Sequence, residues 1–143
     1  MRMLMLHVDH FSSTITKKGR SKVVEACNPN SKTTRVDEAL LVLVSVENKD
    51  ETNPDNVSKK TAEEITKIAH QLNVSTVVLH PFAHLFGELS KPEIAIEALK
   101  LTEEKLIQGG LKVIRTPFGW FNTLELKAKG HTLSRVARVI SSN

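Results

Sequence analysis

The sequence predicts an α/β fold: a single-domain mixed sheet with helices packed against it. Short apolar segments rich in branched residues alternate with two segments of helical period in the middle of the chain. A strand-helix-strand-helix-strand order implies right-handed crossovers, and therefore a sheet that is at least partly parallel. The 143 residues, 40% of them hydrophobic and 25% charged, can bury roughly two thirds of the unfolded surface in one core.

The first third of the chain reads as strands. Apolar segments at 2–8, 22–27 and 39–47 carry the aliphatic and β-branched residues typical of strands. Between the last two lies 28–34, whose Asn, Pro and Ser residues predict a loop. A charged Asp9-His10 pair and no small-residue cleavage site follow the first segment, so we interpret it as a strand rather than a signal peptide.

A first helix is expected from Pro54 to near Asn73, and a strand at 75–80 follows it. Asn53 can cap the amino end of the helix, and proline suits the first helical position. Apolar residues then recur along one face at Ile65, Ile68, Ala69 and Leu72.

A second helix is expected to begin at Ser90-Lys91-Pro92-Glu93, where Ser90 and Glu93 suit a capping box. It should end at Gln108, because Gly109-Gly110 can adopt the left-handed conformation that stops a helix. Strands at 111–115 and 121–128 and a short helix at 132–140 complete the prediction, and 141–143 reads as the start of a linker.

Two turns of similar composition follow predicted strands, at His80-Pro81-Phe82-Ala83-His84-Leu85 and at Thr116-Pro117-Phe118-Gly119-Trp120-Phe121. Ligands of open α/β sheets bind outside the carboxyl ends of strands, so the two turns predict one pocket. Five of the six aromatic residues lie in or beside these turns. Stacking on a nucleobase would use them well, since it stabilises by roughly 1 to 3 kcal/mol per base.

Composition narrows the class of protein. No apolar run is long enough to span a bilayer, and the single Cys27 fits a reducing compartment, so we expect a cytoplasmic protein without membrane contact. The sequence has no Gly-x-Ser-x-Gly elbow, Gly-rich phosphate loop or dinucleotide fingerprint, and we expect no cofactor. The net charge of +4 could assist contact with a phosphate backbone without proving it.

The histidines leave two interpretations open. His80 and His84 are four residues apart, but Pro81 between them disfavours the helix that a metal motif of this spacing needs. His7, Asp9, His10 and His131 could add ligands, yet no compact ligand motif exists, and we expect no metal. A structural role is the alternative for each of His7, His80, His84 and His131.

An ordered set of short motifs resembles the N-terminal editing domain of archaeal-type threonyl-tRNA synthetase. The motifs are Glu47 to Pro54, His80 to Leu85, Glu88-Leu89-Ser90-Lys91-Pro92, Pro117-Phe118-Gly119-Trp120 and Lys129-Gly130-His131. The resemblance spans nearly the whole chain and is weakest over 11–35. It implies that 1–143 is an editing domain, the N-terminal part of a longer chain that is either a complete threonine-tRNA ligase or a separate editing protein, with a fold similar to D-aminoacyl-tRNA deacylases and usually a homodimer.

The activity that the resemblance implies is hydrolysis of serine wrongly attached to tRNA(Thr), with the serine-bearing terminal adenosine as the ligand. Threonine exceeds serine by one methyl group, from which a pocket gains only about 1 to 3 kcal/mol, so a second hydrolytic site is needed.

The resemblance also implies site residues. Ser45, Val46 and Glu47 would line the pocket, chiefly through backbone groups, although plain strand interior is the alternative for the first two. The adenosine and seryl group would be held by Pro81, Phe82, Ala83, Phe118, Gly119, Trp120 and Phe121. His84 corresponds to a family histidine near the ester.

Two departures from the family pattern concern catalysis. Many members carry a lysine where this chain has Asn122, and a family glutamate near the start of the last predicted helix is here Arg135. An amide does not take up a proton at neutral pH, so Asn122 can contribute only hydrogen bonds at the catalytic position. We therefore hypothesise that the ribose 2′-hydroxyl of the substrate assists a water positioned by backbone amides, with His84 orienting the ester.

Two alternative functions remain at this point. A D-aminoacyl-tRNA deacylase would share the fold and chemistry but prefer other side chains. A non-catalytic tRNA-binding appendage would bind tRNA in a salt-sensitive way without hydrolysing an ester.

Overall fold

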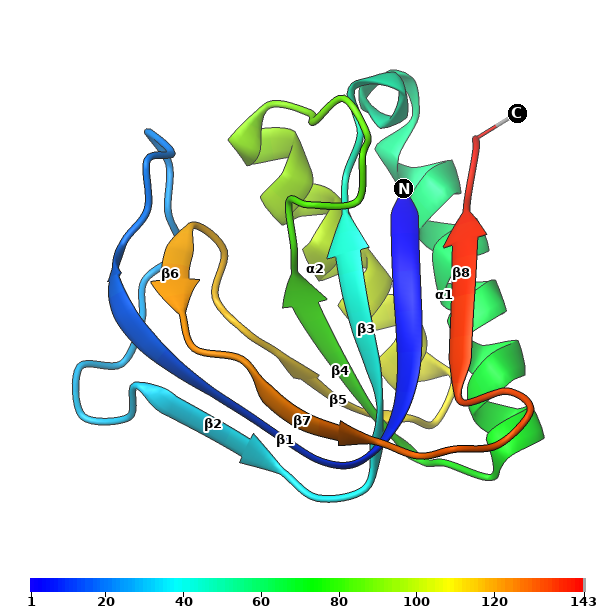
Figure 1. Cartoon of the computed structure of the whole chain (residues 1–143). Coiled ribbons are helices and arrows are strands. Elements are labelled where there is room, and N and C mark those ends of the chain that lie inside the picture. Colours follow the sequence, from blue (N-terminus) through cyan, green and yellow to red (C-terminus); the bar gives the residue numbers. More distant parts are fainter. Residues whose placement is uncertain (143) are drawn as a thin grey trace.

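The computed structural model describes residues 1–142, and it has the predicted α/β class. Eight strands form one curled mixed sheet with two helices packed against it (Figure 1). The strands are β1 (Arg2–Lys18), β2 (Thr33–Val36), β3 (Ala39–Ser45), β4 (Thr76–Pro81), β5 (Lys112–Arg115), β6 (Trp120–Asn122), β7 (Glu125–Ala128) and β8 (Arg135–Val139). The helices are the 3₁₀ turn η1 (Asn48–Thr52), α1 (Pro54–Leu72) and α2 (Pro92–Gln108).

The parallel part of the sheet follows the predicted crossovers. β3 pairs with β4, and β4 with β5, both in parallel, with α1 and α2 as the connections. The Asn53 side chain accepts from the Asn56 amide, and Asn73 ends α1 in the left-handed conformation at φ 54°. Neither helix in the described part of the chain is long and apolar enough to cross a membrane.

The long strand β1 takes part in two regions of the sheet. Its first half lies between β3 and β8, and its second half pairs with β2 on one side and with β7 and β6 on the other. The register shifts between Val8 and His10, and beyond this irregularity β1 swings away from the helices with β2 and β6 (Figure 1). Both faces of β3 are therefore covered, which explains why all seven of its residues are buried.

Four sequence predictions of secondary structure are wrong. Residues 22–27 form no strand, although they are extended, and part of the predicted loop at 28–34 is the start of β2. Residues 132–140 hold the strand β8 instead of a helix, because the open edge of β1 pairs with them. The predicted strand at 121–128 is two short strands, β6 and β7.

The predicted capping box of α2 is also absent. Lys91 is the N-cap, and the Ser90 hydroxyl donates to the carbonyl of Lys91. The Glu51 carboxylate instead accepts from the Lys91 amide at 2.8 Å, which anchors the start of α2 to η1. At the other end Gly110 takes the predicted positive φ, +91°. Of the expected linker residues, Asn143 lies outside the described residues.

Candidate active site

A cavity of about 660 Å³ opens at the carboxyl ends of β3 and β4. The two Pro-Phe turns line it together, along with the first turns of α2 and the segment 19–21. Of the predicted site residues, those along its walls are Ser45, Val46, Pro81, Phe82, Ala83, His84, Phe118, Gly119, Trp120, Phe121 and Asn122. Glu47 is the predicted residue that does not line it.

The first Pro-Phe turn, His80 to Leu85, continues β4, and the neighbouring strand β3 holds it in place. The Phe82 amide donates to the Val44 carbonyl at 2.9 Å, which carries the parallel pairing past the end of β4. Phe82 and His84 meet edge to face, with ring centroids 5.4 Å apart. His84 is exposed and lies on the cavity wall, so it can reach a bound ligand without being buried.

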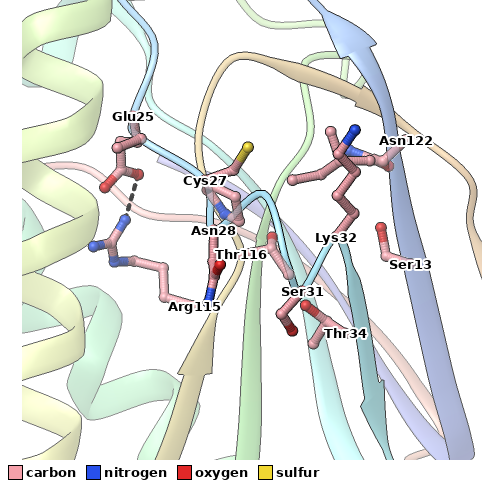
Figure 2. A pocket seen from close by; sticks show the side chains of 13 residues that line it. Ser13, Glu25, Cys27, Asn28, Ser31, Lys32, Thr34, Arg115, Thr116 and Asn122 are labelled. Carbon is pink, nitrogen blue, oxygen red and sulfur yellow. Dashed lines mark hydrogen bonds and ion pairs between the residues drawn. The ribbon is translucent and has the colours of Figure 1, made fainter.

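The second Pro-Phe turn, Thr116 to Phe121, is held by residues 22–27, the extended segment that the sequence predicts as a strand. The Glu25 amide donates to the Phe118 carbonyl at 3.0 Å, and the Trp120 indole donates to the Glu25 carbonyl at 2.7 Å. The Glu25 carboxylate accepts from the Phe118 amide and pairs with Arg115 (Figure 2). No local motif in the sequence marks Glu25, because it acts across 93 positions of the chain.

Gly119 needs its lack of a side chain. Its φ is +95°, and a Cβ atom there would lie 2.5 Å from Val24 Cγ1. The Gly19 amide donates to the Gly119 carbonyl at 2.8 Å, so two segments approach this turn closely. The turn is therefore a rigid wall of the cavity.

The third wall comes from the end of β3. The Val46 carbonyl accepts from the Ser90 amide at 3.0 Å, which ties the end of β3 to the segment before α2. The Ser45 hydroxyl is buried and has no hydrogen-bond partner within the described residues. An unsatisfied buried hydroxyl carries a desolvation cost, which a polar ligand atom in the cavity would relieve.

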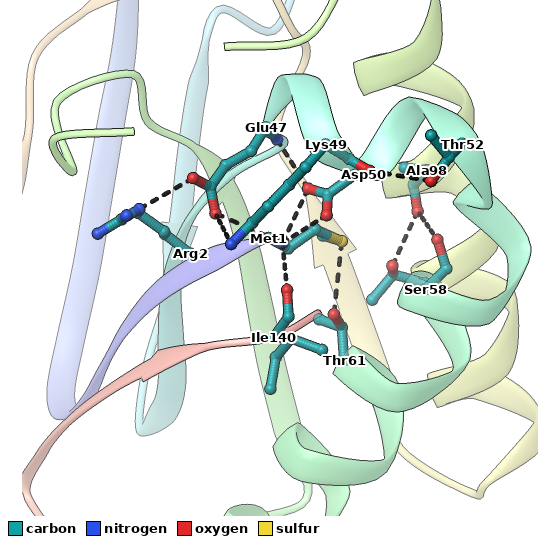
Figure 3. A network of polar contacts seen from close by, with 11 residues as sticks. Met1, Arg2, Glu47, Lys49, Asp50, Thr52, Ser58, Thr61, Ala98 and Ile140 are labelled. Carbon is teal, nitrogen blue, oxygen red and sulfur yellow. Dashed lines mark hydrogen bonds and ion pairs between the residues drawn. The ribbon is translucent and has the colours of Figure 1, made fainter. Parts of the chain in front are cut away.

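Glu47 has a different environment, in an ionic cluster behind the wall (Figure 3). Its carboxylate accepts from Arg2 at 3.0 Å and lies 3.7 Å from the α-ammonium of Met1. That ammonium lies 2.8 Å from the Asp50 carboxylate, which also accepts from the Glu47 amide at 2.7 Å. The cluster fixes the backbone at Glu47, directly after the cavity-lining residues Ser45 and Val46.

His80 lies at the boundary of the cavity and is nearly fully buried. Burial lowers the pKa of His80 from 6.5 to about 4, and a hydrogen bond to Asn122 offsets part of the shift. Its Nδ1 lies 2.8 Å from the Thr116 hydroxyl, so Nε2 faces Asn122. The Asn122 amide nitrogen donates to the Trp120 carbonyl, which leaves its oxygen to accept from a neutral His80.

The other predicted polar residues lie elsewhere. His7 and His131 are 2.8 Å apart, between nitrogen atoms, and His7 contacts Glu38. Arg135 donates to the carbonyl of Lys129 and is absent from the cavity wall. Within residues 1–142, no Asp, Glu or Lys side chain lines the cavity, and Arg20 is the charged residue on its wall.

The cavity thus combines aromatic faces, backbone groups, two histidines and an amide. Such a lining suits a neutral ligand with an aromatic ring and several hydrogen-bonding groups, such as a nucleoside. It offers no carboxylate to remove a proton from water, among the described residues.

Comparison with known proteins identifies the family. Residues 1–140 match the family described as the archaea-specific editing domain of threonyl-tRNA synthetase. Threonine–tRNA ligases are similar to this chain: that of Thermococcus kodakarensis is 43% identical over 98% of this chain and 22% of its own length. That of Methanocaldococcus jannaschii is 39% identical over the same shares, and that of Methanosphaera stadtmanae 37% over 99% and 23%.

The match over nearly the whole chain defines the class of protein as an editing domain of an aminoacyl-tRNA synthetase. The chain belongs to the archaea-specific editing domain family of threonyl-tRNA synthetase. It spans about a fifth of the length of the curated relatives that it matches.

Proposed function

We propose that the cavity hydrolyses the ester of L-serine mischarged on tRNA(Thr) and spares threonine. The observation that carries the proposal is the joint cavity of the two aromatic turns in a chain of the editing family. The terminal adenosine stacks on the aromatic turn residues, while the seryl group lies toward Ser45 and Val46. The relatives are named threonine–tRNA ligases, which makes tRNA(Thr) the natural partner.

The reaction is substrate-assisted. Water adds to the ester carbonyl carbon, the bond to the ribose 3′-oxygen breaks, and the proton of the water passes to that oxygen, releasing serine and a free 3′-hydroxyl. The adjacent 2′-hydroxyl shuttles this proton, because neutral His80 and the Asn122 amide are poor bases at neutral pH. Backbone amides and His84 orient the water and the ester, and orientation alone can lower a barrier by several kcal/mol, on the order of 7 or more in favourable cases.

Deacylation assays on one tRNA test the specificity. The seryl ester of tRNA(Thr) should be hydrolysed and the threonyl ester spared. Faster hydrolysis of D-aminoacyl esters would instead indicate a D-aminoacyl-tRNA deacylase, and salt-sensitive binding without hydrolysis would indicate a non-catalytic appendage.

A terminal 2′-deoxyadenosine tests the mechanism. Seryl-tRNA with this single change should bind as well as the natural substrate but lose most of its hydrolysis, because the proton shuttle is gone. Hydrolysis at the normal rate would refute substrate assistance and leave the specificity proposal intact.

The proposal extends to the assembled protein. The resemblance implies a homodimer, and the sequence predicts a cytoplasmic protein. Sedimentation velocity on the purified chain tests the homodimer. A single species of monomer mass would contradict it.

A further inference from the structure

A second, smaller cavity of about 220 Å³ lies behind Asn122 (Figure 2). Asn122 lines both cavities, and Thr116, the partner of His80, lines the small one. Hydroxyl and amide groups dominate its wall: Ser13, Ser31, Thr34, Thr116, Asn28 and Asn122. The small cavity is therefore a polar compartment next to the candidate active site.

The strands bring one lysine into this compartment. Ile15 of β1 pairs with Asn122 on one side, and its amide donates to the Lys32 carbonyl on the other. Residues directly opposite one another in neighbouring strands point to the same face. The side chains of Lys32 and Asn122, on either side of Ile15, therefore point to the same face of the sheet. Figure 2 shows the Lys32 side chain extending toward Asn122.

The charge of the compartment is positive. Arg115 and Glu25 both line it, but they pair with each other, and Arg115 also donates to Glu103 at 3.0 Å. Lys32 makes no ion pair with any residue of the described chain. The compartment therefore holds one cation without a counter-ion, surrounded by hydroxyl and amide donors.

The surrounding surface is also basic. Residues 10–36, which form the outer half of β1, the following loop and β2, are called the basic arm here. They contain Lys17, Lys18, Arg20, Lys22, Lys32 and Arg35 against the single acid Glu25. Six positive charges less one negative charge give +5, whereas the whole chain carries +4. The net charge of the protein thus resides in this arm, which borders both cavities.

We propose that the small cavity seats the phosphodiester that precedes the terminal adenosine of the tRNA, with Lys32 as its counter-ion. The inference rests on the proposed function, because the adenosine in the large cavity places its 5′-phosphate near the shared residue Asn122. A phosphate group needs one cation and several neutral donors, which is the composition of this wall. The remaining cations of the basic arm attract the nucleotides farther along the strand.

Equilibrium binding of short RNA tests the site without requiring hydrolysis. The probes are the trinucleotide CCA and the same trinucleotide with a neutral methylphosphonate at the last linkage, measured by calorimetry. The natural probe should bind about fivefold more tightly, and its affinity should fall with salt. In Lys32→Met the two probes should bind alike, with the salt slope reduced by about 0.7. Lys59→Met, an exposed lysine on α1, is the matched control and should behave as the wild type.

The outcomes separate this inference from the proposed function. If the wild type hydrolyses no seryl ester but still discriminates the two probes through Lys32, the phosphate site stands and the deacylase proposal fails. If seryl-tRNA is hydrolysed but both probes bind equally, the phosphate site is refuted. Equally tight binding of inorganic phosphate and CCA would also overturn it, since the site would then be a free-anion site.

The single cysteine provides a second measurement. Cys27 lines the small cavity and is partly exposed, so a thiol-alkylating reagent reports whether the cavity is filled. Saturating CCA should slow its alkylation severalfold in the wild type, and the methylphosphonate probe at the same concentration should protect it less. Equal protection by both probes would contradict a phosphate in this cavity.

Discussion

The two cavities share Asn122 but differ in chemistry. The large cavity has aromatic and aliphatic walls, a neutral buried histidine and an unpartnered hydroxyl. The small cavity has hydroxyl and amide walls and an unpaired lysine. In the proposed complex, this difference would match the two halves of a nucleotide, its neutral nucleoside and its charged phosphate, on opposite sides of one side chain.

The largest expected effect is a loss of folding stability at low pH, caused by protonation of His80 beside the shared residue Asn122. His80 has a pKa of about 4 in the folded protein and about 6.5 when exposed. The unfolded chain therefore binds the proton first, so stability is complete above pH 6.5 and falls as the pH drops toward 4. The loss is on the order of 3 kcal/mol.

Urea unfolding at pH 7.5 and pH 4.5 measures this loss. Carboxylates titrate in the same range, so His80→Asn serves as the reference that lacks the histidine contribution. An identical loss of stability in the wild type and the variant would show that His80 is not held neutral.

The next largest effect is expected on turnover, when the turn at Gly119 in the aromatic wall is displaced. In Gly119→Ala the new methyl group collides with Val24 at a φ of +95°, which displaces the turn. A displacement of about 1 Å can lower turnover on the order of a hundredfold. Gly130→Ala is the control, because its Cβ would meet nothing within 4 Å. Equal seryl-tRNA deacylation by both variants would mean that the turn does not position the substrate.

Replacement of the buried Ser45 hydroxyl distinguishes a role in ligand binding from a role in folding. In Ser45→Ala, kcat/KM for the seryl ester should fall about tenfold if the hydroxyl serves the ligand. Its melting temperature should stay equal or rise, because an unsatisfied group is removed. Ser75→Ala, at an exposed position before β4, should change neither quantity. A lower melting temperature with unchanged kinetics would assign Ser45 to the core.

His84 should have the smallest effect. It is exposed at the rim, and its proposed role is to orient the ester, so His84→Ala should lower kcat about threefold, well below the roughly hundredfold or greater loss typical of a general base. Single-turnover deacylation measures this directly, with His70→Ala on the exposed face of α1 as the control. Complete loss of hydrolysis would identify His84 as the base and remove the need for substrate assistance.

Much of the fold could be predicted from local signals. Asn53-Pro54 starts α1 and Asn73 ends it, and Gly110 takes the positive φ predicted for the end of α2. These features are local, because a cap or a left-handed residue satisfies backbone groups within one turn. The predicted Ser90 capping box does not form, because an acceptor remote in sequence takes its place. The Glu51 carboxylate accepts from the amide at the start of α2.

Predictions failed where a distant partner decides the conformation. Residues 132–140 become β8 because the edge of β1 is free to pair with them. Residues 22–27 leave the sheet because their hydrogen bonds go to the 118–120 turn. Glu47 lies off the cavity wall because its carboxylate is held by Arg2 and Met1, which face the end of β3 across the β1–β3 pair but are remote in the chain.

The sequence by itself determined the α/β class, the two helices and the aromatic turns, because each depends on residues close together in the chain. Tertiary structure alone decided that the turns share one cavity and that His80 is held neutral between Thr116 and Asn122. It also brought Lys32 behind Asn122, 90 residues away in the chain. The physical reason is that burial, ion pairing and strand register depend on neighbours in space, which residue spacing does not specify.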